Sequence, residues 1–577
     1  MKSESTELPD SVISHIFSKL SLKNLVKTSA LSKQWYHEWG LRKDLTFDLH
    51  NMFDYNTIPE LPKTLSHFQQ LQSQFAASLD NFMQKYPGDM VRSIRVNFPL
   101  GVDHTYAIDG LIHKGLFKGA NRIELLFAYK TDFKIEPYKF LFPFLSDTNF
   151  VTYLHLQNCH IAEPMEFSLL KNLTTLVLHL VPVKQNMLQD LCVNCIYLEN
   201  LTLNECKFLS DLRITSPTLL HLYINCGLII WKKSNIDITA SNLSSIEYSS
   251  GCVSVLHTVN IKSHMLSKFS YRCAKISNLI DFSGLKNMTT FVLDGLRQCL
   301  QSDVIVHLFS KCLQLEDVTF KKCRFTCDLK IMSAKLLHLS LIDCLYKNHG
   351  SHKIDIDALN LSSFEYRGHT VMSPLISVAA PKLLKVFWDA GLNKRNVYNF
   401  ATIVRLHQIE NLTMSMSLSQ IRKLTKGLVR FQNLKQLKLF IAGAYNPNMD
   451  YFWILDIAMA SQHLQKLSLT IRNGDTKKSH MVGSQRQRRE YVRFFHNDLR
   501  YVELHGCVCS LNVIELASHL LRNATLLKQI TFSSRRSFYI GAGRWSKGFD
   551  NCGWFERNLI HEHLQDEVNE QCQLIIL

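Results

Sequence analysis

A short alternation of apolar and polar residues recurs along most of this chain and often ends in cysteine. Typical copies are VTYLHLQNC (151–159), LENLTLNEC (198–206) and LEDVTFKKC (315–323). A period of two puts the apolar residues on one face of a strand and the intervening residues on the other. One such strand cannot bury its apolar face alone, but stacked copies form a continuous core. The pattern therefore predicts a row of stacked strands.

The central apolar residues of the copies fall at regular steps. They are Leu154, Leu176, Leu201, Leu222, Ile246, Phe269, Phe291, Val318, Leu339, Phe364 and Val386. Most steps lie within the roughly 20–29 residues typical of a leucine-rich repeat. We therefore expect irregular leucine-rich repeats over residues 91–475, in an α/β solenoid of horseshoe form.

A longer repeat is superimposed on the short one. DLRITSPTLLHLYINC, from Asp211, matches DLKIMSAKLLHLSLID, from Asp328, and NLSSIEY, from Asn242, matches NLSSFEY, from Asn360. Cys195 and Cys312 begin equivalent lines, which gives an offset of 117 residues. The sequence thus indicates an internal duplication of a block of roughly a hundred residues.

The N-terminal segment has the spacing of three short helices. Leu8-Pro9-Asp10 has the form of a helix start, and Ile13, Ile16 and Leu20 follow at helical spacing. A second helix is expected near Lys23, and a third carries Trp35 and Trp39. Three short helices bury little core, so we expect them to meet a partner surface. The alternative is a small helical cap on the repeats.

LPDSVISHIFSKLSLKNLVKTSALSKQWYHEW (8–39) closely resembles the F-box of plant proteins, with Ser21 where that motif usually has proline. The resemblance implies docking onto a Skp1-like adaptor and, through it, a cullin–RING ubiquitin ligase. It assigns the adaptor contact to apolar residues of the helices, in the mode of helix faces in a hydrophobic groove. These residues are Leu8, Pro9, Ile13, Ile16, Leu20, Leu25 and Val26. We assign residues 1–47 to the F-box and 48–90 to a helical linker.

The C-terminal region reads strand, helix, strand, with Ile514, Ala517, Leu520 and Leu521 on one helix face. This stretch resembles the FBD segment of plant F-box/leucine-rich-repeat proteins. Physically it looks like one more repeat that caps the array. We assign 476–545 to this FBD-like cap and 546–577 to a tail without apparent chemistry.

The cysteines and the charge do not point to catalysis or to nucleic acid. Cys192 and Cys195 form a CxxC pair without a second pair in reach, so the cysteines are expected to be buried packing residues and no metal is expected. The net charge of +16 invites a nucleic-acid reading, but the basic residues are dispersed apart from a cluster at Arg486, Arg488 and Arg489. That cluster is either a solvated loop or a nuclear-import signal. We found no arrangement of residues typical of a catalytic site or a cofactor site, and no apolar run long enough for a membrane helix.

In a leucine-rich repeat, the polar residues between the apolar ones line the concave face. Here they mix charges and aromatic rings, which favours a protein target over nucleic acid. The candidate target-binding residues are His155, Thr202, Tyr223, Glu247, Arg272, Asp294, Lys321, Glu365, Arg367 and Asp389.

Taken together, the resemblance and the repeats predict the substrate-recognition subunit of an SCF-type E3 ubiquitin ligase, without catalytic residues or a cofactor of its own. The F-box would hold the adaptor and the concave face a protein target, in the nucleus or cytoplasm. Two alternatives remain: a repeat scaffold without a ligase role, and a basic regulator that binds nucleic acid.

Overall fold

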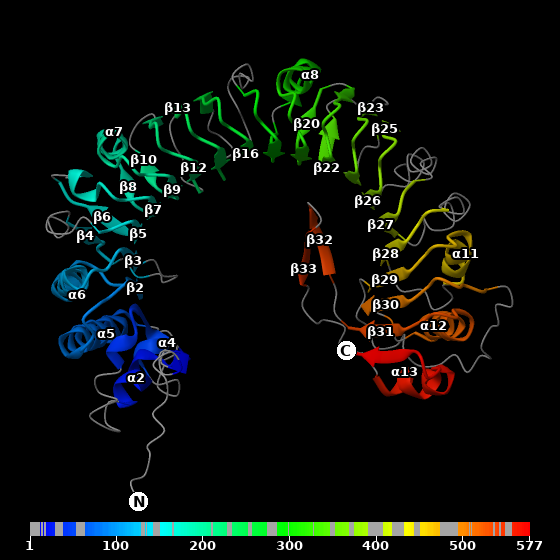
Figure 1. The fold of residues 1–577 in the computed structure, drawn as a ribbon, viewed down its shortest axis with the longest axis horizontal. Coiled ribbons are helices and arrows are strands. Elements are labelled where there is room, and N and C mark those ends of the chain that lie inside the picture. Colours follow the sequence, from blue (N-terminus) through cyan, green and yellow to red (C-terminus); the bar gives the residue numbers. More distant parts are fainter. Residues whose placement is uncertain are drawn as a thin grey trace, which may run out of the picture. The chain divides into compact units, whose positions relative to one another are not determined.

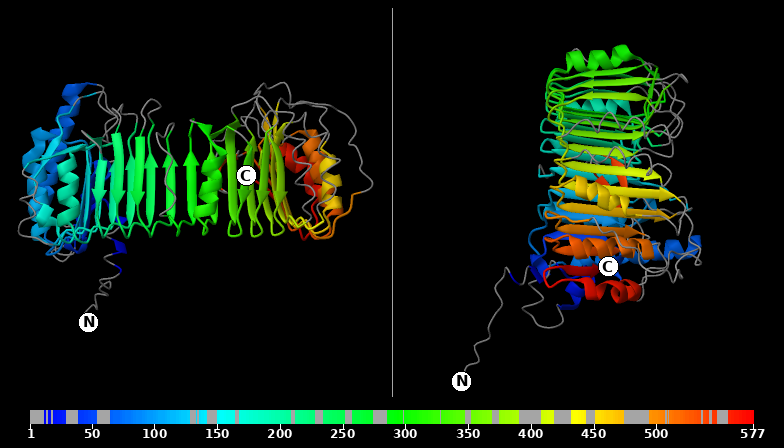
Figure 2. Two further views of the ribbon diagram at one scale, coloured as in Figure 1. Left: turned by 90° about the horizontal axis from the view of Figure 1, so that it is seen from above. Right: turned by 90° about the vertical axis from the view of Figure 1, so that its right-hand side faces the viewer.

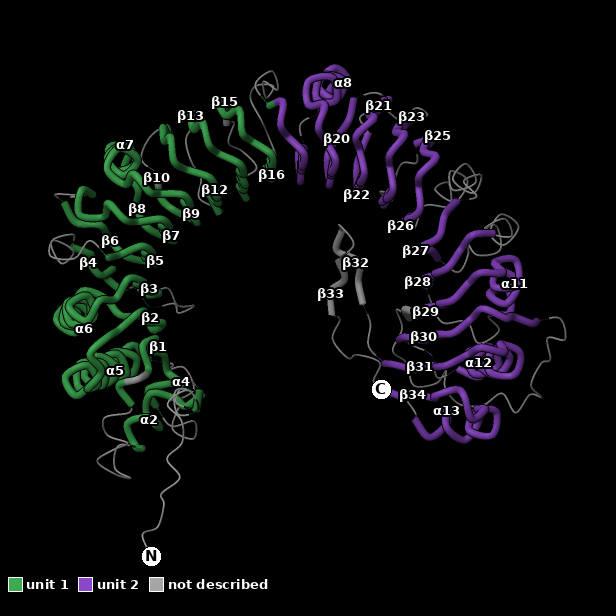
Figure 3. Tube along the Cα trace, in the orientation of Figure 1, with its two compact units in different colours: residues 1–285 green, residues 286–577 purple. Residues whose placement is uncertain are grey.

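A computed structural model gives the fold of the 577-residue chain. The structure describes residues 12, 15–16, 19–28, 39–53, 64–127, 133, 135–141, 150–163, 167–208, 212–227, 234–251, 257–273, 285–297, 299–326, 328–346, 352–368, 374–389, 408–417, 432–443, 451–473, 494–506, 508, 510–534, 537–541, 544–547 and 557–577. The chain divides into two compact units, residues 1–285 and 286–577 (Figure 3). We call them the first and the second unit and describe each by itself.

The first unit is built on a parallel sheet, which we call its inner sheet. Its strands are β1 (Asp44–Asp48), β2 (Ser93–Asn97), β3 (Arg122–Leu126), β5 (Tyr153–Gln157), β7 (Thr175–His179), β9 (Asn200–Asn204), β12 (His221–Asn225), β14 (Ser245–Ser249) and β16 (Lys268–Arg272). Each strand pairs in parallel with the next in this order. The strands lie side by side on the inner, concave side of the unit (Figures 1 and 2).

The outer side of the first unit carries helices and short strands (Figure 1). The outer helices are α5 (Leu65–Lys85), α6 (Thr105–Phe117) and α7 (Gln185–Asn194), whereas α2 (Leu22–Thr28) and α4 (Leu49–Met52) lie beside β1 at the N-terminal end of the unit. The 3-10 turns span Trp39–Leu41, Val102–His104 and Phe167–Leu170. The short strands are β4 (Tyr138–Phe140), β6 (Cys159–Ile161), β8 (Pro182–Val183), β10 (Lys207–Phe208), β11 (Leu212–Thr215), β13 (Ser234–Thr239) and β15 (His257–Lys262).

The second unit repeats this plan with a longer inner sheet. Its parallel strands are β17 (Thr290–Asp294), β19 (Asp317–Lys321), β22 (His338–Tyr346), β24 (Ser363–Gly368), β26 (Lys385–Asp389), β27 (Asn411–Ser417), β28 (Gln436–Gly443), β29 (Lys466–Asn473), β30 (Tyr501–Gly506), β31 (Gln529–Ser533) and β34 (Gln573–Ile576).

Its other elements are again helices and short strands. The helices α8 (Ser302–Lys311), α11 (Trp453–Ala460), α12 (Leu511–Asn523) and α13 (Arg557–Leu564) lie on the outer side (Figure 1), and a 3-10 turn spans Gln565–Glu567. The short strands are β18 (Cys299–Leu300), β20 (Arg324–Phe325), β21 (Leu329–Met332), β23 (Lys353–Asp357) and β25 (Leu375–Ala379), and β32 (Ser537–Gly541) pairs antiparallel with β33 (Arg544–Lys547).

The apolar alternation explains the core of both units. Every central apolar residue predicted from the pattern, from Leu154 to Val386, occupies the second position of an inner strand and is at most 3% exposed. In the first unit these side chains form one row, because the register pairs Leu154 with Leu176, Leu176 with Leu201 and so on to Phe269. The predicted α/β repeat solenoid is thereby confirmed.

The chain leaves many inner strands through a tight left-handed turn. Asn158, Glu205 and Lys322 each follow the fifth strand residue and have φ between 51° and 54°. Their backbone N–H groups donate to the fifth strand residue of the next repeat, as from Glu205 to the Asn225 carbonyl at 2.6 Å. At the corresponding place in β30, after its fifth residue, the chain has Gly506, where a Cβ would lie 2.3 Å from the Ile471 carbonyl oxygen.

Parallel strands that continue the repeat sheets lie on both sides of residues 91–475, the region predicted to hold the repeats. The sheet begins at β1, inside the segment assigned to the F-box, because Leu45 and Phe47 are buried against β2. The described part of residues 48–90 contains α4 and α5. Helix α5 packs against the sheet, because Phe75 stacks on Phe98 at 4.3 Å and Phe82 meets Phe47 of β1 edge-to-face at 5.3 Å.

At the other end, the expected strand-helix-strand is present as β30, α12 and β31. The described part of residues 546–577, which were assigned to a tail, folds into α13 and β34 and continues the repeat sheet. Helix α13 packs on α12 with Ile560 and Leu564 fully buried, and β34 pairs with β31.

Candidate functional site

The predicted target-binding residues of the first unit lie on the inner face of its sheet. His155, Thr202, Tyr223 and Glu247 take the third position of β5, β9, β12 and β14, and the register joins the last three in one row. Arg272 takes the fifth position of β16, two residues further along the strand than the third position. The strand alternation turns all of them away from the core.

In the second unit the predicted residues also share the inner face, and ion pairs connect several of them. Arg367 Nε lies 3.3 Å from Asp389 Oδ2 and 3.3 Å from Asp343 Oδ1, and Lys321 Nζ lies 3.8 Å from Asp294 Oδ2.

Two of these predicted carboxylates offer little surface. Glu365 is 8% exposed and accepts a 2.7 Å hydrogen bond from Ser340 Oγ, and Asp294 is 9% exposed. Lys321, Arg367 and Asp389 are therefore the more accessible members of this part of the face.

Sequence reasoning missed a charged group at the start of the first unit's inner face. Arg95 in β2 and Arg122 in β3 both reach Glu124, at 3.6 Å and 2.7 Å, and the Arg122 guanidinium lies 3.5 Å from the ring centroid of Tyr153. The signal was present as the alternation in SIRVN and RIELL.

His155 belongs to the same neighbourhood. Burial, opposed by Glu124 and assisted by His179, lowers the pKa of His155 to about 4, so the ring is neutral at neutral pH. Its Nε2 atom is buried without a hydrogen-bond partner among the described residues. At the next strand, His179 Nδ1 lies 2.8 Å from Gln157 Nε2.

A comparable charged group near the end of the second unit was also missed. Glu503 in β30 lies 2.6 Å from Lys466 Nζ in β29 and 3.7 Å from His505 Nε2. The His505 ring and then the Lys466 ammonium lower the pKa of Glu503 to about 2. The inner face of each unit thus mixes both signs of charge.

The cysteines that close the strands are packing residues, as predicted. Cys206 and Cys323 are fully buried, and their thiols donate to backbone carbonyls of the preceding strand, at 3.2 Å to Leu178 and 3.4 Å to Leu293. Burial raises the pKa of Cys206 to about 12, so its thiol stays protonated. Cys192 and Cys195 are likewise buried and free. Within the described residues, no group of histidine, cysteine and carboxylate side chains could hold a metal ion.

The N-terminal segment is described in part. Leu8, Pro9 and Ile13 lie outside the described residues. Ile16 and Val26 are each 37% exposed, and Leu20 is half-buried. Leu25 is fully buried within the chain, and its contact with an adaptor stays a prediction.

Ser21 takes the place of the usual proline without leaving the helix uncapped. Its Oγ accepts a hydrogen bond from the Asn24 backbone N–H at 3.2 Å, the geometry of an N-cap for α2. Trp39 is 1% exposed and packs edge-on against Phe82 and Tyr86. Phe82 lies in α5 and Tyr86 directly follows that helix, so Trp39 attaches the N-terminal segment to α5.

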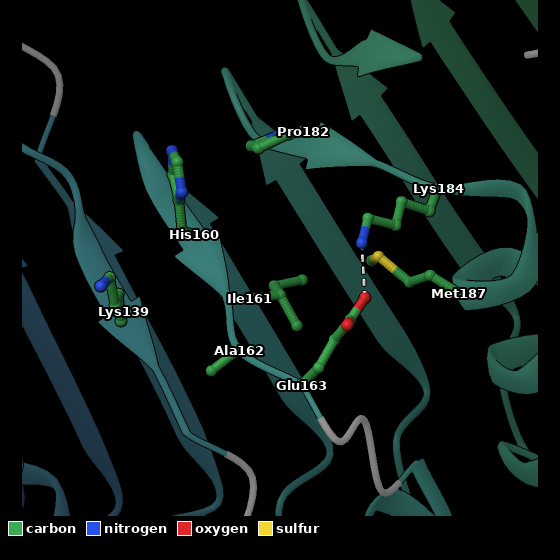
Figure 4. A pocket seen from close by; sticks show the side chains of 8 residues that line it. All are labelled: Lys139, His160, Ile161, Ala162, Glu163, Pro182, Lys184 and Met187. Atoms are coloured by element: carbon green, nitrogen blue, oxygen red, sulfur yellow. Dashed lines mark hydrogen bonds and ion pairs between the residues drawn. The ribbon is translucent and has the colours of Figure 1, made fainter. Parts of the chain in front are cut away.

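A small pocket of about 310 Å³ lies on the first unit, away from the inner face (Figure 4). Lys139 of β4, His160 and Ile161 of β6 and Met187 of α7 line it, and Lys184 crosses it to bind Glu163 at 2.5 Å. It contains none of the predicted site residues. Among the described residues, no helix is long and apolar enough to cross a membrane.

Two family comparisons fit this arrangement. The F-box domain matches residues 5–43, and the family described as "At1g61320/AtMIF1, LRR domain" matches residues 82–281 and 264–566, which together exceed half of the chain.

Two plant proteins from Arabidopsis thaliana are similar over parts of the chain. One is the F-box/FBD/LRR-repeat protein At1g13570, 25% identical over 220 residues, which are 38% of this chain and 48% of that protein. The other is the putative F-box/FBD/LRR-repeat protein At3g49030, 29% identical over 98 residues, which are 17% of this chain and 18% of that protein. The aligned part thus spans about half the length of the first relative and less than a fifth of the second. With an F-box ahead of a parallel-strand repeat sheet, this chain belongs to the At1g61320/AtMIF1 LRR-domain family and is a plant F-box/LRR protein.

Proposed function

We propose that this protein is the substrate-recognition subunit of an SCF-type E3 ubiquitin ligase. Its F-box docks a Skp1-like adaptor that connects it to a cullin–RING ligase, and the inner faces of its repeats hold a protein target. The observation that carries this proposal is the joining of two parts in one chain: a matched F-box at residues 5–43 and a repeat sheet with an open polar face.

The contribution of such a subunit is proximity. Holding a target beside the ubiquitin-charged enzyme raises the effective concentration of target lysines, without bond chemistry by the receptor itself. The mixed charges of the inner face, such as Arg367 between Asp343 and Asp389, suit a protein target better than a uniformly negative nucleic acid. By its resemblance to FBD segments and the names of the two relatives, the stretch 476–545 is proposed to be such a segment. The proposed location is the nucleus or the cytoplasm.

Binding of the purified full chain to a Skp1-like adaptor tests this proposal. Ile16→Asp and Val26→Asp each place a charge at an exposed apolar position of the F-box. We expect each variant to bind the adaptor at least about tenfold more weakly, because the adaptor would bury this charge without a partner. Phe117→Asp is the matched control, since Phe117 is 85% exposed at the end of α6 and outside the F-box.

The outcome separates the ligase reading from its rival. Adaptor binding that is lost in the F-box variants and kept in the control would support the receptor role. Failure of the folded wild-type chain to bind any Skp1-like adaptor would leave a repeat scaffold without a ligase role as the better account.

A further inference from the structure

The charged group at the start of the first unit's inner face has the composition of a small anion site. Its members come from three adjacent strands: Arg95 from β2, Arg122 and Glu124 from β3, and Tyr153 from β5. The register places Glu124 directly beside Arg95, and Arg122 directly beside Tyr153. We call these four residues the arginine pair site.

The charges in this site do not balance. Two guanidinium groups share one carboxylate, which leaves one positive charge in excess. Glu124 is 6% exposed, whereas the side chains of Arg95 and Arg122 are 46% and 43% exposed. Each guanidinium has five N–H donors, and the contacts to Glu124 occupy few of them. Donors therefore remain at the surface of the inner face.

The site is also held in place. The Arg122 guanidinium carbon lies 3.5 Å from the Tyr153 ring centroid, and its Nε donates to Glu124 Oε1 at 2.7 Å, so two contacts hold this guanidinium in place. The nearby Asp44 is paired with Arg92 and accepts from Ser93 at 2.7 Å, so its charge is already compensated. His155 of β5 lies directly beside Glu124 in the register, and its ring is neutral at physiological pH. A bound anion would therefore meet preset donors and one uncompensated charge.

We propose that the arginine pair site binds a single carboxylate of the target protein, an aspartate or glutamate side chain on the segment that lies along the inner face. One negative charge completes the balance of two arginines and Glu124. A phosphate dianion would instead leave excess negative charge beside a buried carboxylate. This assignment deepens the proposed function, because it rests on the inner face being the target-binding face.

The test uses random short peptides displayed on phage and selected on the intact chain. We expect the selected peptides to be enriched in aspartate or glutamate at one position. A synthetic peptide from this set is then compared with its Glu→Gln or Asp→Asn version, on wild-type protein and on Arg95→Gln. We expect the amide version to bind wild type roughly tenfold more weakly, and both versions to bind Arg95→Gln equally weakly.

Arg95→Gln is chosen because it removes the excess charge and leaves the buried Glu124 its close partner, Arg122. The double variant Arg95→Gln/Glu124→Gln restores a net charge of one through Arg122, and we expect it to recover most of the affinity for the acidic peptide. The matched control is Arg213→Gln, since Arg213 is an exposed arginine of β11, outside the inner sheet.

Three results would overturn the assignment. They are wild-type affinity in Arg95→Gln, no recovery in the double variant, and tighter binding of a peptide with phosphoserine in place of the acid. Adaptor binding is measured on the same samples. Acid-dependent peptide binding without adaptor binding would keep this site and reject the ligase role, and the reverse result would keep the ligase role and reject this site.

Discussion

Single residues explain why the alternation along the chain becomes a stack of repeats. A thiol such as that of Cys323 fills a fully buried place after its strand and satisfies the carbonyl of Leu293 one repeat back. The sequence predicted the burial, because cysteine recurs where the alternation ends. It could not predict the hydrogen bond, which depends on the left-handed turn at Lys322 and on the neighbouring strand.

At Ser21, removal of a side-chain cap should weaken α2. Ser21→Ala deletes the oxygen that accepts from the Asn24 N–H, and such caps contribute about 1 kcal/mol. We expect about fivefold faster hydrogen exchange at the α2 amides in the variant. Ser73→Ala, at an exposed serine in α5, is the control and should leave α2 unchanged. Equal exchange in wild type and Ser21→Ala would show that the cap contributes nothing.

At His155, burial should make stability depend on pH. The folded pKa is about 4 and the unfolded pKa is about 6.5, so below pH 6.5 the unfolded state binds more protons than the folded state. Stability contributed by the neutral ring is therefore lost as the pH falls from about 6.5 to about 4. We expect the Tm of wild type to fall more steeply over this range than that of His155→Gln. His221→Gln removes an exposed histidine of β12, and its profile should follow wild type.

At the scale of elements, the strands in the middle of each sheet were predictable and the end elements were not. Inner strands such as β9 and β19 are buried on one face and keep a strict alternation. β1 could not be recognised as the first strand of the sheet, because its five residues, DLTFD, follow directly on the F-box motif. β34 is an edge strand whose residues are partly exposed, so its sequence carries no burial alternation and only its pairing with β31 defines it.

The C-terminal helix should therefore matter for stability although its sequence looked uninformative. Leu564 in α13 is fully buried against the last repeats, and Leu564→Ala should cost about 2–5 kcal/mol of unfolding free energy in the second unit. Leu577→Ala makes the same substitution at a side chain that is 55% exposed and should cost less than about 0.5 kcal/mol. Urea denaturation followed by circular dichroism measures both. Similar midpoints for the two variants would mean that α13 does not belong to the cooperative core.

For the whole molecule, the duplication seen in the sequence is retained in three dimensions. The equivalent elements α7 and α8 start at residues 185 and 302, β9 and β19 at 200 and 317, and β16 and β26 at 268 and 385. Each pair is 117 residues apart, as the cysteines had indicated. The two copies could be aligned from sequence alone because their core positions must stay apolar. Their ion pairs could not be predicted, since those depend on residues from neighbouring strands.

The copies carry different charges on the inner face. Ser249 and Arg272 of the first copy correspond to Arg367 and Asp389 of the second, whereas Tyr271 in the core corresponds to the equally buried Trp388. Exchange of a face residue should thus be tolerated better than exchange of a core residue. Arg367→Ser breaks ion pairs of a half-exposed side chain and should cost no more than about 1 kcal/mol.

Trp388→Tyr puts the first copy's core residue into the second copy, where the smaller ring leaves a cavity, and we expect a cost of about 1–3 kcal/mol. Thermal unfolding of the two variants beside wild type measures the contrast. A larger loss for Arg367→Ser would mean that the charges on this face hold the repeats together. A larger loss for Trp388→Tyr means that the core alone fixes the fold, which leaves the inner face free to change with whatever it binds.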